Sequence, residues 1–289
     1  MRILVTADLH YDIDRSRQPA IDAADRICRL GGDALLVLGD VAGHDPAILR
    51  ECLRLFDRFA GAKFFVAGNH DIWTAPGGDS LHRFEVELPE LCREAGFHML
   101  DEKPALLDGL GLVGSMGWYD LSYRPAHLNI PLRFYEAKVA PGAAARLPDH
   151  AHLVADRSDI PETAMRIGTR WMDGVHVRLP VGDATFCNQL GERLSEHLAW
   201  ASRHAERIVV GLHHLPFRDL VPPTDKPSWA FASAYLGSEV FGQALLEYPK
   251  ARHVFCGHSH KPGSLTREHV VCVNVGSTYL AKRFEIVDL

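Results

Sequence analysis

Hydrophobic residues in the first hundred positions fall into short apolar runs that alternate with longer amphipathic stretches. The runs Arg2–Thr6, Ala34–Leu38 and Phe64–Ala67 are apolar enough to be strands buried on both faces of a sheet. The stretches between and after them have helical spacing: Arg17–Leu30, Pro46–Phe59 and Leu81–Ala95. This βαβαβα order predicts a parallel sheet with right-handed crossovers.

The last hundred residues return to the same alternation after a region of short strands and turns at 98–115. Helices are expected near Gln189–Ala205 and Ser233–Glu247. The expected strands are Ile208–Val210, His253–Cys256, Val270–Val275 and Arg283–Val287. A four-layer α/β/β/α sandwich accounts for this order better than a simple doubly wound sheet, so the fold class is expected to be α/β.

Between about 118 and 183 the periodicity weakens and prolines interrupt any long helix. A structureless loop of that length is unusual inside a compact domain. We therefore expect one domain over residues 1–289, with an irregular, cap-like insertion at about 118–183 near the active site. A second irregular stretch, Pro216–Trp229, is expected to overhang the same place.

Composition narrows the class of protein. The 289 residues are 47% hydrophobic and 24% charged, which is ordinary for a globular protein. The net charge of −6 gives no general attraction to nucleic acid or to an anionic membrane. No run approaches the roughly 20 apolar residues of a membrane span, and no signal-peptide pattern precedes the first strand. A cytoplasmic location without membrane partners is the expectation. The six cysteines form no CxxC pair and are expected to be buried thiols.

Five of the predicted strands end in residues that bind hard or borderline metal ions. These segments are Asp8-Leu9-His10, Gly39-Asp40, Gly68-Asn69-His70-Asp71, His213-His214 and Gly257-His258-Ser259-His260. Asp8-Leu9-His10 and Gly39-Asp40 alone are common strand ends or turns, whereas Gly68-Asn69-His70-Asp71 and Gly257-His258-Ser259-His260 are more specific signals. Together they lie where α/β enzymes place their sites, and this combination favours a centre for two adjacent cations.

The spacing of these residues suggests two ion sites. Asp8 and His10 are two apart, and on an extended backbone such side chains point the same way. Consecutive strand residues face opposite ways, so we prefer His213 as a ligand and treat His214 as a supporting or substrate-contacting group. The expected sites are Asp8, His10, Asp40 and His260 for one ion, and Asp40, Asn69, His213 and His258 for the other. Asp40 would bridge the two ions.

His70 and Asp71 are the expected catalytic pair. The His70 imidazole can give a proton to a leaving oxygen, and Asp71 could orient that ring. An Asn-based turn that caps the next segment is the alternative reading of this motif.

These ordered motifs resemble those of the calcineurin-like metallophosphoesterase superfamily. Asn274-Val275-Gly276-Ser277 also resembles its frequent Asn-Pro-Gly-Ser, with valine replacing proline. The resemblance covers roughly 1–117 and 186–289. It implies the four-layer sandwich and two divalent or trivalent metal ions. Because no tyrosine follows the second motif to ligate iron as in purple acid phosphatases, manganese is favoured, with iron or zinc as alternatives.

The function expected from these charges is hydrolysis of a phosphomonoester or phosphodiester. Two cations polarise the phosphoryl oxygens and activate a bridging water as the attacking hydroxide, with His70 as general acid. The substrate would be a small phosphorylated molecule or nucleotide. Candidates to contact it are Trp73, Arg124, Trp118, Tyr119, Tyr123 and Trp229, although ordinary packing is the alternative for each. Arg166, Arg170 and Arg178, with Asp173 and Asp183, look like a mixed, solvated face.

Two alternative functions stay open. A nuclease would use the same chemistry but needs a basic track for the nucleic-acid backbone, which the net charge does not support. A non-catalytic metal-binding scaffold is less favoured because no ligand is missing. The oligomeric state is not indicated by the sequence.

Overall fold

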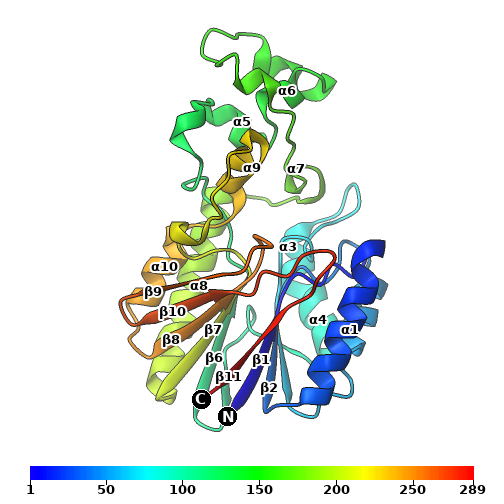
Figure 1. Ribbon diagram of the computed structural model, residues 1–289, viewed down its shortest axis with the longest axis vertical. Helices are drawn as coiled ribbons and strands as arrows, with labels where there is room; N and C mark the ends of the chain where they lie inside the picture. Colours follow the sequence, from blue (N-terminus) through cyan, green and yellow to red (C-terminus); the bar gives the residue numbers. More distant parts are fainter.

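The computed structural model describes residues 1–289 and contains two β-sheets. The first sheet has the strand order β11-β1-β2-β3-β4. Its parallel strands are β1 (Arg2–Thr6), β2 (Ala34–Leu38), β3 (Ala62–Val66) and β4 (His98–Met99), and β11 (Phe284–Asp288) joins β1 in the antiparallel sense. The Met1 ammonium donates to the Leu289 carbonyl oxygen at 2.7 Å, so the two termini lie side by side (Figure 1).

The second sheet has the strand order β5-β6-β7-β8-β10-β9. Its four central strands are parallel: β6 (Leu110–Ser115), β7 (Arg207–Leu212), β8 (Ala251–Cys256) and β10 (Val270–Asn274). The two edge strands run antiparallel to their neighbours: β5 (Ala105–Leu107) and β9 (Gly263–Arg267). The parallel strands of both sheets therefore have carboxyl ends at which loops can gather.

The two sheets pack face to face, with helices on their outer faces. Ile3 and Val5 belong to the apolar cluster between the sheets, whereas Leu4 points into the larger cluster beneath the helices. This alternation follows from the two-residue period of a strand. Figure 1 shows α1 (Asp14–Leu30) and α4 (Leu88–Glu94) outside one sheet, and α8 (Asp183–His204) and α10 (Glu239–Leu246) outside the other. The predicted four-layer sandwich is confirmed.

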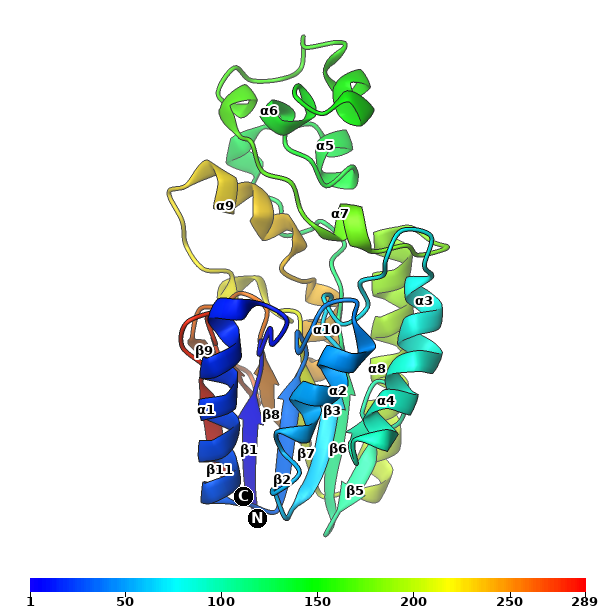
Figure 2. The same ribbon diagram turned by 90° about the vertical axis from the view of Figure 1, so that its right-hand side faces the viewer.

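Residues 116–182 connect β6 to α8, and we call this segment the insertion. It consists of short helices and turns: η2 (Ala126–Leu128), α5 (Leu132–Glu136), α6 (Pro141–Ala144), η3 (Pro148–Val154), η4 (Ala164–Arg166) and α7 (Asp173–His176). α9 (Pro227–Ala232) packs against it, because the rings of Tyr135 and Phe231 stack with centroids 4.6 Å apart. Figure 2 shows the insertion at the end of the molecule opposite the termini.

Some expected elements differ from the observed ones. The helix expected at Leu81–Ala95 is interrupted by a π-helical turn, η1 (Arg83–Glu87), between α3 (Ser80–His82) and α4. α2 (Pro46–Arg54) ends before Phe59, and α8 begins at Asp183 rather than near Gln189. The helix expected from Ser233 splits into η6 (Ser233–Tyr235) and α10, after η5 (Arg218–Leu220) and α9. The Ser238 side chain caps α10 by accepting from the Val240 N–H.

Strand β9 was not expected, because its sequence Gly-Ser-Leu-Thr-Arg is largely exposed and lacks apolar alternation. It forms by pairing with the edge of β10. None of the helices combines the length and the apolar character needed to span a bilayer.

Candidate active site

The predicted metal-binding motifs lie in tight turns just beyond the strands. Asp8, His10, Asp40, His258 and His260 all have positive φ, with values of 57°, 43°, 51°, 69° and 56°. Residues other than glycine adopt this left-handed conformation rarely, and such strain gathers at functional sites. The expectation that Asp8 and His10 converge because their backbone is extended is wrong. A turn beyond β1 brings them together instead.

Four of the expected side chains form the first group. One ligand atom from each of Asp8, His10, Asp40 and His260 lies within 4.8 Å of every other. The Nε2 atoms of His10 and His260 are 3.1 Å apart, and Asp8 Oδ1 is 3.7 Å from His260 Nε2. His10 and Asp8 are fully buried, whereas the His260 side chain is 23% exposed. A cation here would be reached from the His260 side.

The second group contains Asp40, Asn69, His213 and His258. His213 Nε2 lies 3.1 Å from His258 Nδ1 and 3.2 Å from Asn69 Oδ1. The other ring nitrogens face the carbonyl oxygens of Leu38 and Tyr235, at 2.9 and 3.2 Å. A carbonyl can only accept, so those nitrogens carry the ring hydrogens. In the neutral rings, two nitrogen lone pairs and an amide oxygen therefore converge, which suits a cation.

Asp40 lies between the two groups. Its Oδ2 is 3.6 Å from His10 Nε2, and its Oδ1 is 3.3 Å from His213 Nε2. Burial alone raises the pKa of Asp40, but His213 and His70 outweigh it and hold that pKa well below its usual value. Burial likewise lowers the pKa of His213, yet Asp40 raises it overall to about 9. One ionised carboxylate thus faces both halves of the centre.

Close backbone packing holds this carboxylate in place. A Cβ atom on Gly68 would lie 2.3 Å from both the backbone nitrogen and Oδ1 of Asp40, so only glycine fits there. The His70 N–H donates to Asp40 Oδ1 at 3.0 Å. The turn after β3 therefore supports the side chain at the end of β2.

Asp71 supports the same turns rather than the His70 ring. Its carboxylate accepts from the backbone N–H groups of Val41, Ala42 and Gly68 at 2.8–3.1 Å. No hydrogen bond joins it to His70, whose Nδ1 has no partner. The expected orienting contact from Asp71 to His70 is therefore wrong.

Two further side chains brace the turns. Arg83, in the π-helical turn, donates to the carbonyl oxygens of Asp71 and Gly43 at 2.6 and 3.1 Å. Asn274 donates to the Gly257 carbonyl and to Ser259 Oγ, both at 2.9 Å. The Asn274-Val275-Gly276-Ser277 motif thus supports the Gly-His-Ser-His turn.

Lys282 lies beneath the first group. It donates to the Asp8 carbonyl oxygen at 2.5 Å, and burial lowers its pKa to about 8. No sequence signal singled out this residue.

His70 projects beside both groups, with its Nε2 3.9 Å from Asp40 Oδ2 and a side chain 17% exposed. Its ring stacks on Trp73 with centroids 3.7 Å apart and planes inclined by 22°. Trp73 also stacks with His176, at 4.5 Å. Trp73, a candidate from the sequence, thus sets the ring plane of His70.

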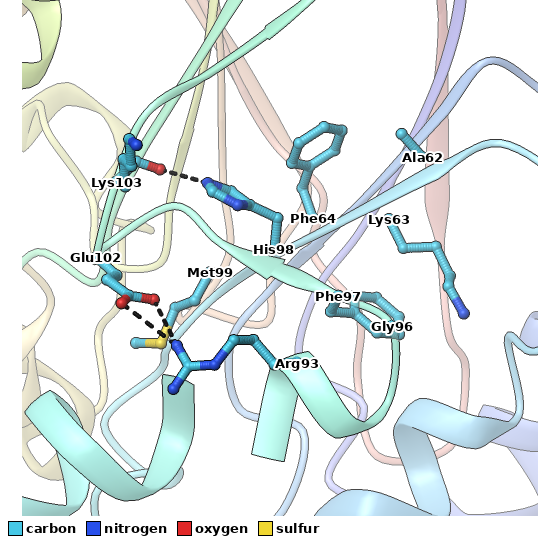
Figure 3. Close-up of a pocket in the computed structure, with 10 residues that line it drawn as sticks. All are labelled: Ala62, Lys63, Phe64, Arg93, Gly96, Phe97, His98, Met99, Glu102 and Lys103. Atoms are coloured by element: carbon cyan, nitrogen blue, oxygen red, sulfur yellow. Dashed lines mark hydrogen bonds and ion pairs between the residues drawn. The ribbon is translucent and has the colours of Figure 1, made fainter. Parts of the chain in front are cut away.

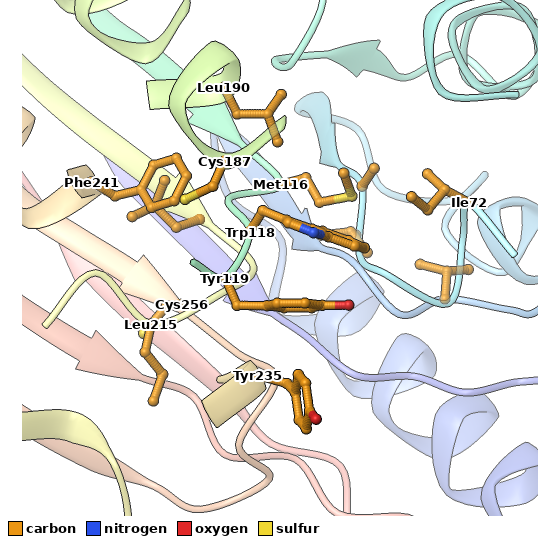
Figure 4. Packing of buried hydrophobic residues seen from close by; sticks show 14 of the residues in the cluster. Ile72, Met116, Trp118, Tyr119, Cys187, Leu190, Leu215, Tyr235, Phe241 and Cys256 are labelled. Atoms are coloured by element: carbon orange, nitrogen blue, oxygen red, sulfur yellow. The ribbon is translucent and has the colours of Figure 1, made fainter. Parts of the chain in front are cut away.

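Several other expected contacts are not present. Trp118 and Tyr119 are buried in the hydrophobic core (Figure 4). Tyr123 is buried as well, and none of the three lines the cavity described below. His214 is also fully buried: it bonds to the Met116 carbonyl, and its ring lies 4.2 Å from the His258 ring. Burial, the largest cause, lowers the pKa of His214 to about 3. His214 can support His258 but does not face substrate.

A cavity of about 1130 Å³ extends from the metal-binding side chains to the inner side of the insertion. Arg124 does not line it, and the Arg124 guanidinium bonds to the Leu121 carbonyl instead. Arg170, expected on a solvated face, does line it. The other cations in its lining are Arg15, Lys226 and Lys261. Its large apolar and aromatic side chains include Trp73, Trp171, Met172, Trp229 and Tyr279. The sequence did not indicate Arg15, Lys226, Lys261 or Tyr279, because nothing in their spacing marks them.

A second cavity, of about 530 Å³, lies at the β4 edge of the first sheet (Figure 3). There Arg93 pairs with Glu102, and His98 bonds to the Lys103 carbonyl. No group of metal-ligating side chains lies there. The first cavity is therefore the candidate active site.

These two groups of ligand atoms, on this fold, are suited to a metal-dependent hydrolase of phosphoric ester bonds. Residues 1–136 match the model of the calcineurin-like phosphoesterase family, which confirms the resemblance seen in the motifs. That match contains Asp8, His10, Asp40, Asn69 and His70. The curated proteins include no significant sequence match.

Solved structures share the fold over nearly the whole chain. Phosphopantetheinyl Hydrolase (PptH) from Mycobacterium tuberculosis has a TM-score of 0.67 at 19% identity, covering 95% of this chain and 89% of its own. A dimetal phosphatase from Danio rerio has a TM-score of 0.53 at 15% identity, covering 99% and 91%. TT1561 of Thermus thermophilus has a TM-score of 0.52 at 12% identity, covering 96% of this chain and 89% of its own. At these identities the likeness shows the fold.

Proposed function

We propose that the protein hydrolyses a phosphomonoester or phosphodiester with two bound metal ions. The observation that carries this proposal is the convergence of carboxylate, amide and imidazole ligand atoms around Asp40 described above. Asp8, His10, Asp40 and His260 would hold one ion, and Asp40, Asn69, His213 and His258 the other. Oxygen and imidazole ligands suit manganese, iron and zinc, and manganese is the first metal to test.

The chain's own residues divide the remaining work. Bound metal ions supply positive charge that polarises the phosphoryl group and lowers the pKa of water. Two carboxylates with neutral ligands leave the loaded centre net positive, so a phosphate group is attracted. His70 lies beside the centre at the cavity, and we assign it the proton transfer to the leaving oxygen. The stack on Trp73 restricts its ring.

The cavity suggests an elongated substrate. It combines exposed cations such as Arg170 and Lys226 with the aromatic side chains of Trp171 and Trp229. A phosphate ester with a long, partly apolar substituent and further polar groups fits this lining. A phosphopantetheinyl group, named for the Mycobacterium tuberculosis structure, is one member of this class. A nucleotide is another, because aromatic side chains can stack on its base.

Nuclease activity is less favoured. The net charge of −6 gives no general attraction to a nucleic-acid backbone, and the cavity lining also contains the acidic residues Asp12, Asp40 and Asp173. Cleavage of single-stranded oligonucleotides that weakens steeply with salt would reverse this preference. A scaffold without catalysis is disfavoured because every expected ligand and His70 are present at the centre.

The test is hydrolysis of phenyl phosphate and diphenyl phosphate by Mn²⁺-loaded protein, with His70→Gln beside the wild type. Phenolate is a more basic leaving group than p-nitrophenolate, so its departure depends on a proton from a general acid. Removing the general acid should lower kcat by roughly 10²-fold, with Mn²⁺ stoichiometry unchanged. His127→Gln, an exposed histidine of the insertion outside the cavity, is the matched control. Equal turnover in His70→Gln and wild type would remove His70 from the mechanism. Wild-type protein that binds no Mn²⁺ would contradict the proposed function.

A further inference from the structure

One carboxylate of the insertion connects it to the candidate metal centre. Asp173, at the start of α7, is 1% exposed and lies between four hydrogen-bond donors. Its Oδ1 accepts from Asn69 Nδ2 and Trp73 Nε1, both at 2.8 Å. Its Oδ2 accepts from Trp171 Nε1 at 2.7 Å and from the Tyr119 hydroxyl at 3.0 Å. A buried carboxylate that binds four donors has a fixed position.

The Oδ1 side determines which end of the Asn69 amide faces the metal centre. A side-chain amide has a donor end and an acceptor end, and the two are nearly equal in shape. Because a carboxylate can only accept, Asp173 holds the NH₂ end of Asn69. The carbonyl end is then directed toward His213 Nε2, at 3.2 Å. The reversed amide would point its N–H groups at a cation and its oxygen at a carboxylate.

The same oxygen also acts on His70, the proposed general acid, through Trp73. It fixes the Trp73 indole, whose ring stacks on His70 with centroids 3.7 Å apart. His176, three residues after Asp173 in α7, stacks with Trp73 as well. Backbone bonds from Thr74 N to the His176 carbonyl and from Ser80 N to the Arg178 carbonyl hold α7 beside the loop after His70.

We propose that Asp173 is a positioning residue through which the insertion orients the metal ligand Asn69 and, by way of Trp73, the His70 ring. The insertion is then part of the catalytic machinery as well as the wall of the cavity. This inference rests on the proposed function, because it takes Asn69 as a ligand. The alternative is that Asp173 only satisfies Trp171 and Tyr119 inside the fold.

The test compares Asp173→Asn with Tyr119→Phe, which removes one donor from Oδ2 and leaves the Oδ1 side intact. Mn²⁺ binding is measured by calorimetry. The kinetic constants kcat and KM are measured with bis-p-nitrophenyl phosphate as the substrate. Loss of a partner behind a ligand costs about 10- to 100-fold in metal affinity. In Asp173→Asn we expect that loss at one of the two Mn²⁺ sites, with lower kcat and little change in KM. Tyr119→Phe should keep Mn²⁺ affinity within about threefold, since the hydrogen bond from Asn69 to Asp173 Oδ1 is unchanged.

A charge swap provides the second variant. Asn69→Asp, Asp173→Asn and Trp73→Phe are combined, so that the amide introduced at position 173 can donate to the carboxylate introduced at position 69 without facing the Trp73 N–H, which shares Oδ1 in the wild type. The combination keeps one carboxylate and one amide in the pair, so it remains informative if Asp173→Asn alone does not fold, and Trp73→Phe alone is its control. We expect the swap to bind both Mn²⁺ ions about as tightly as the wild type. A swap that folds but binds a single ion overturns the inference, as does Asp173→Asn with wild-type affinity at both sites. In those cases wild-type Mn²⁺ binding and turnover would still support the proposed function.

Discussion

The floor and the roof of the cavity are built in different ways. The floor consists of the strand-end turns that carry the predicted metal ligands, and the roof consists of the insertion together with α9. In the floor, Asp8, His10 and His213 are fully buried, and Asp40 is 1% exposed. In the roof, Trp229 is 64% and Met172 43% exposed, although both line the cavity.

This difference suggests a division of work. Buried groups with several fixed partners keep their geometry whatever the substrate, as catalytic chemistry requires. Exposed side chains on short helices can be exchanged without disturbing that geometry, which suits selection between substrates. Asp173 is where the two regions meet, because it belongs to the roof and bonds to Asn69 in the floor.

The strongest test of the floor is Asp40→Asn. An amide cannot bring a negative charge to both groups, so we expect turnover of every phosphate ester to fall by roughly 10³-fold, about 4 kcal/mol of transition-state stabilisation. Steady-state rates on p-nitrophenyl phosphate and bis-p-nitrophenyl phosphate, with Mn²⁺ content measured alongside, check this. Asp219→Asn, outside the cavity, is a matched control. A loss confined to one substrate would mean that Asp40 selects between substrates. The proposed difference between the floor and the roof would then be contradicted.

The second test of the floor is the pH dependence of metal binding. In the absence of a cation the pKa of His213 is raised to about 9, mainly by Asp40 against the opposing effect of burial. Below that pH a metal ion must displace the proton, and above it the neutral ring is ready to bind. Affinity at one site should therefore weaken about tenfold for each unit that the pH falls below 9. Calorimetric Mn²⁺ titrations at three pH values would show this, and equal affinities at all three would contradict it.

The floor was largely predictable because its residue types are uncommon at the ends of apolar runs. The structure brings all the predicted ligands together in the two groups that share Asp40: Asp8, His10, Asp40, Asn69, His213, His258 and His260. Their backbone conformation was not predictable from a two-residue strand period. The contact between Asp71 and His70 was also wrong, since the nearby backbone N–H groups of Val41, Ala42 and Gly68 take both carboxylate oxygens.

The roof was much less predictable. Its short helices have no apolar period long enough to fix which side chains face inward. Arg170 therefore looked like a solvated residue and Arg124 like a substrate contact, and the cavity reverses these two assignments. Asp173 was expected on the same solvated face, and this expectation is wrong because the residue is buried. It bonds to a residue 104 positions away, so its burial depends on tertiary contacts that no local pattern records.

The smallest expected effect belongs to the roof. Trp229→Ala removes an aromatic wall of the cavity and no ligand. We expect kcat/KM for the p-nitrophenyl ester of thymidine 5′-phosphate to fall about three- to tenfold, since an aromatic contact contributes about 0.5–1.5 kcal/mol. Hydrolysis of p-nitrophenyl phosphate, which has the same leaving group and no large substituent, should not change. Leu132→Ala, at an exposed apolar residue of the insertion outside the cavity, is the control. An equal fall on both substrates would show that Trp229 supports the floor, and the two regions would then act as one.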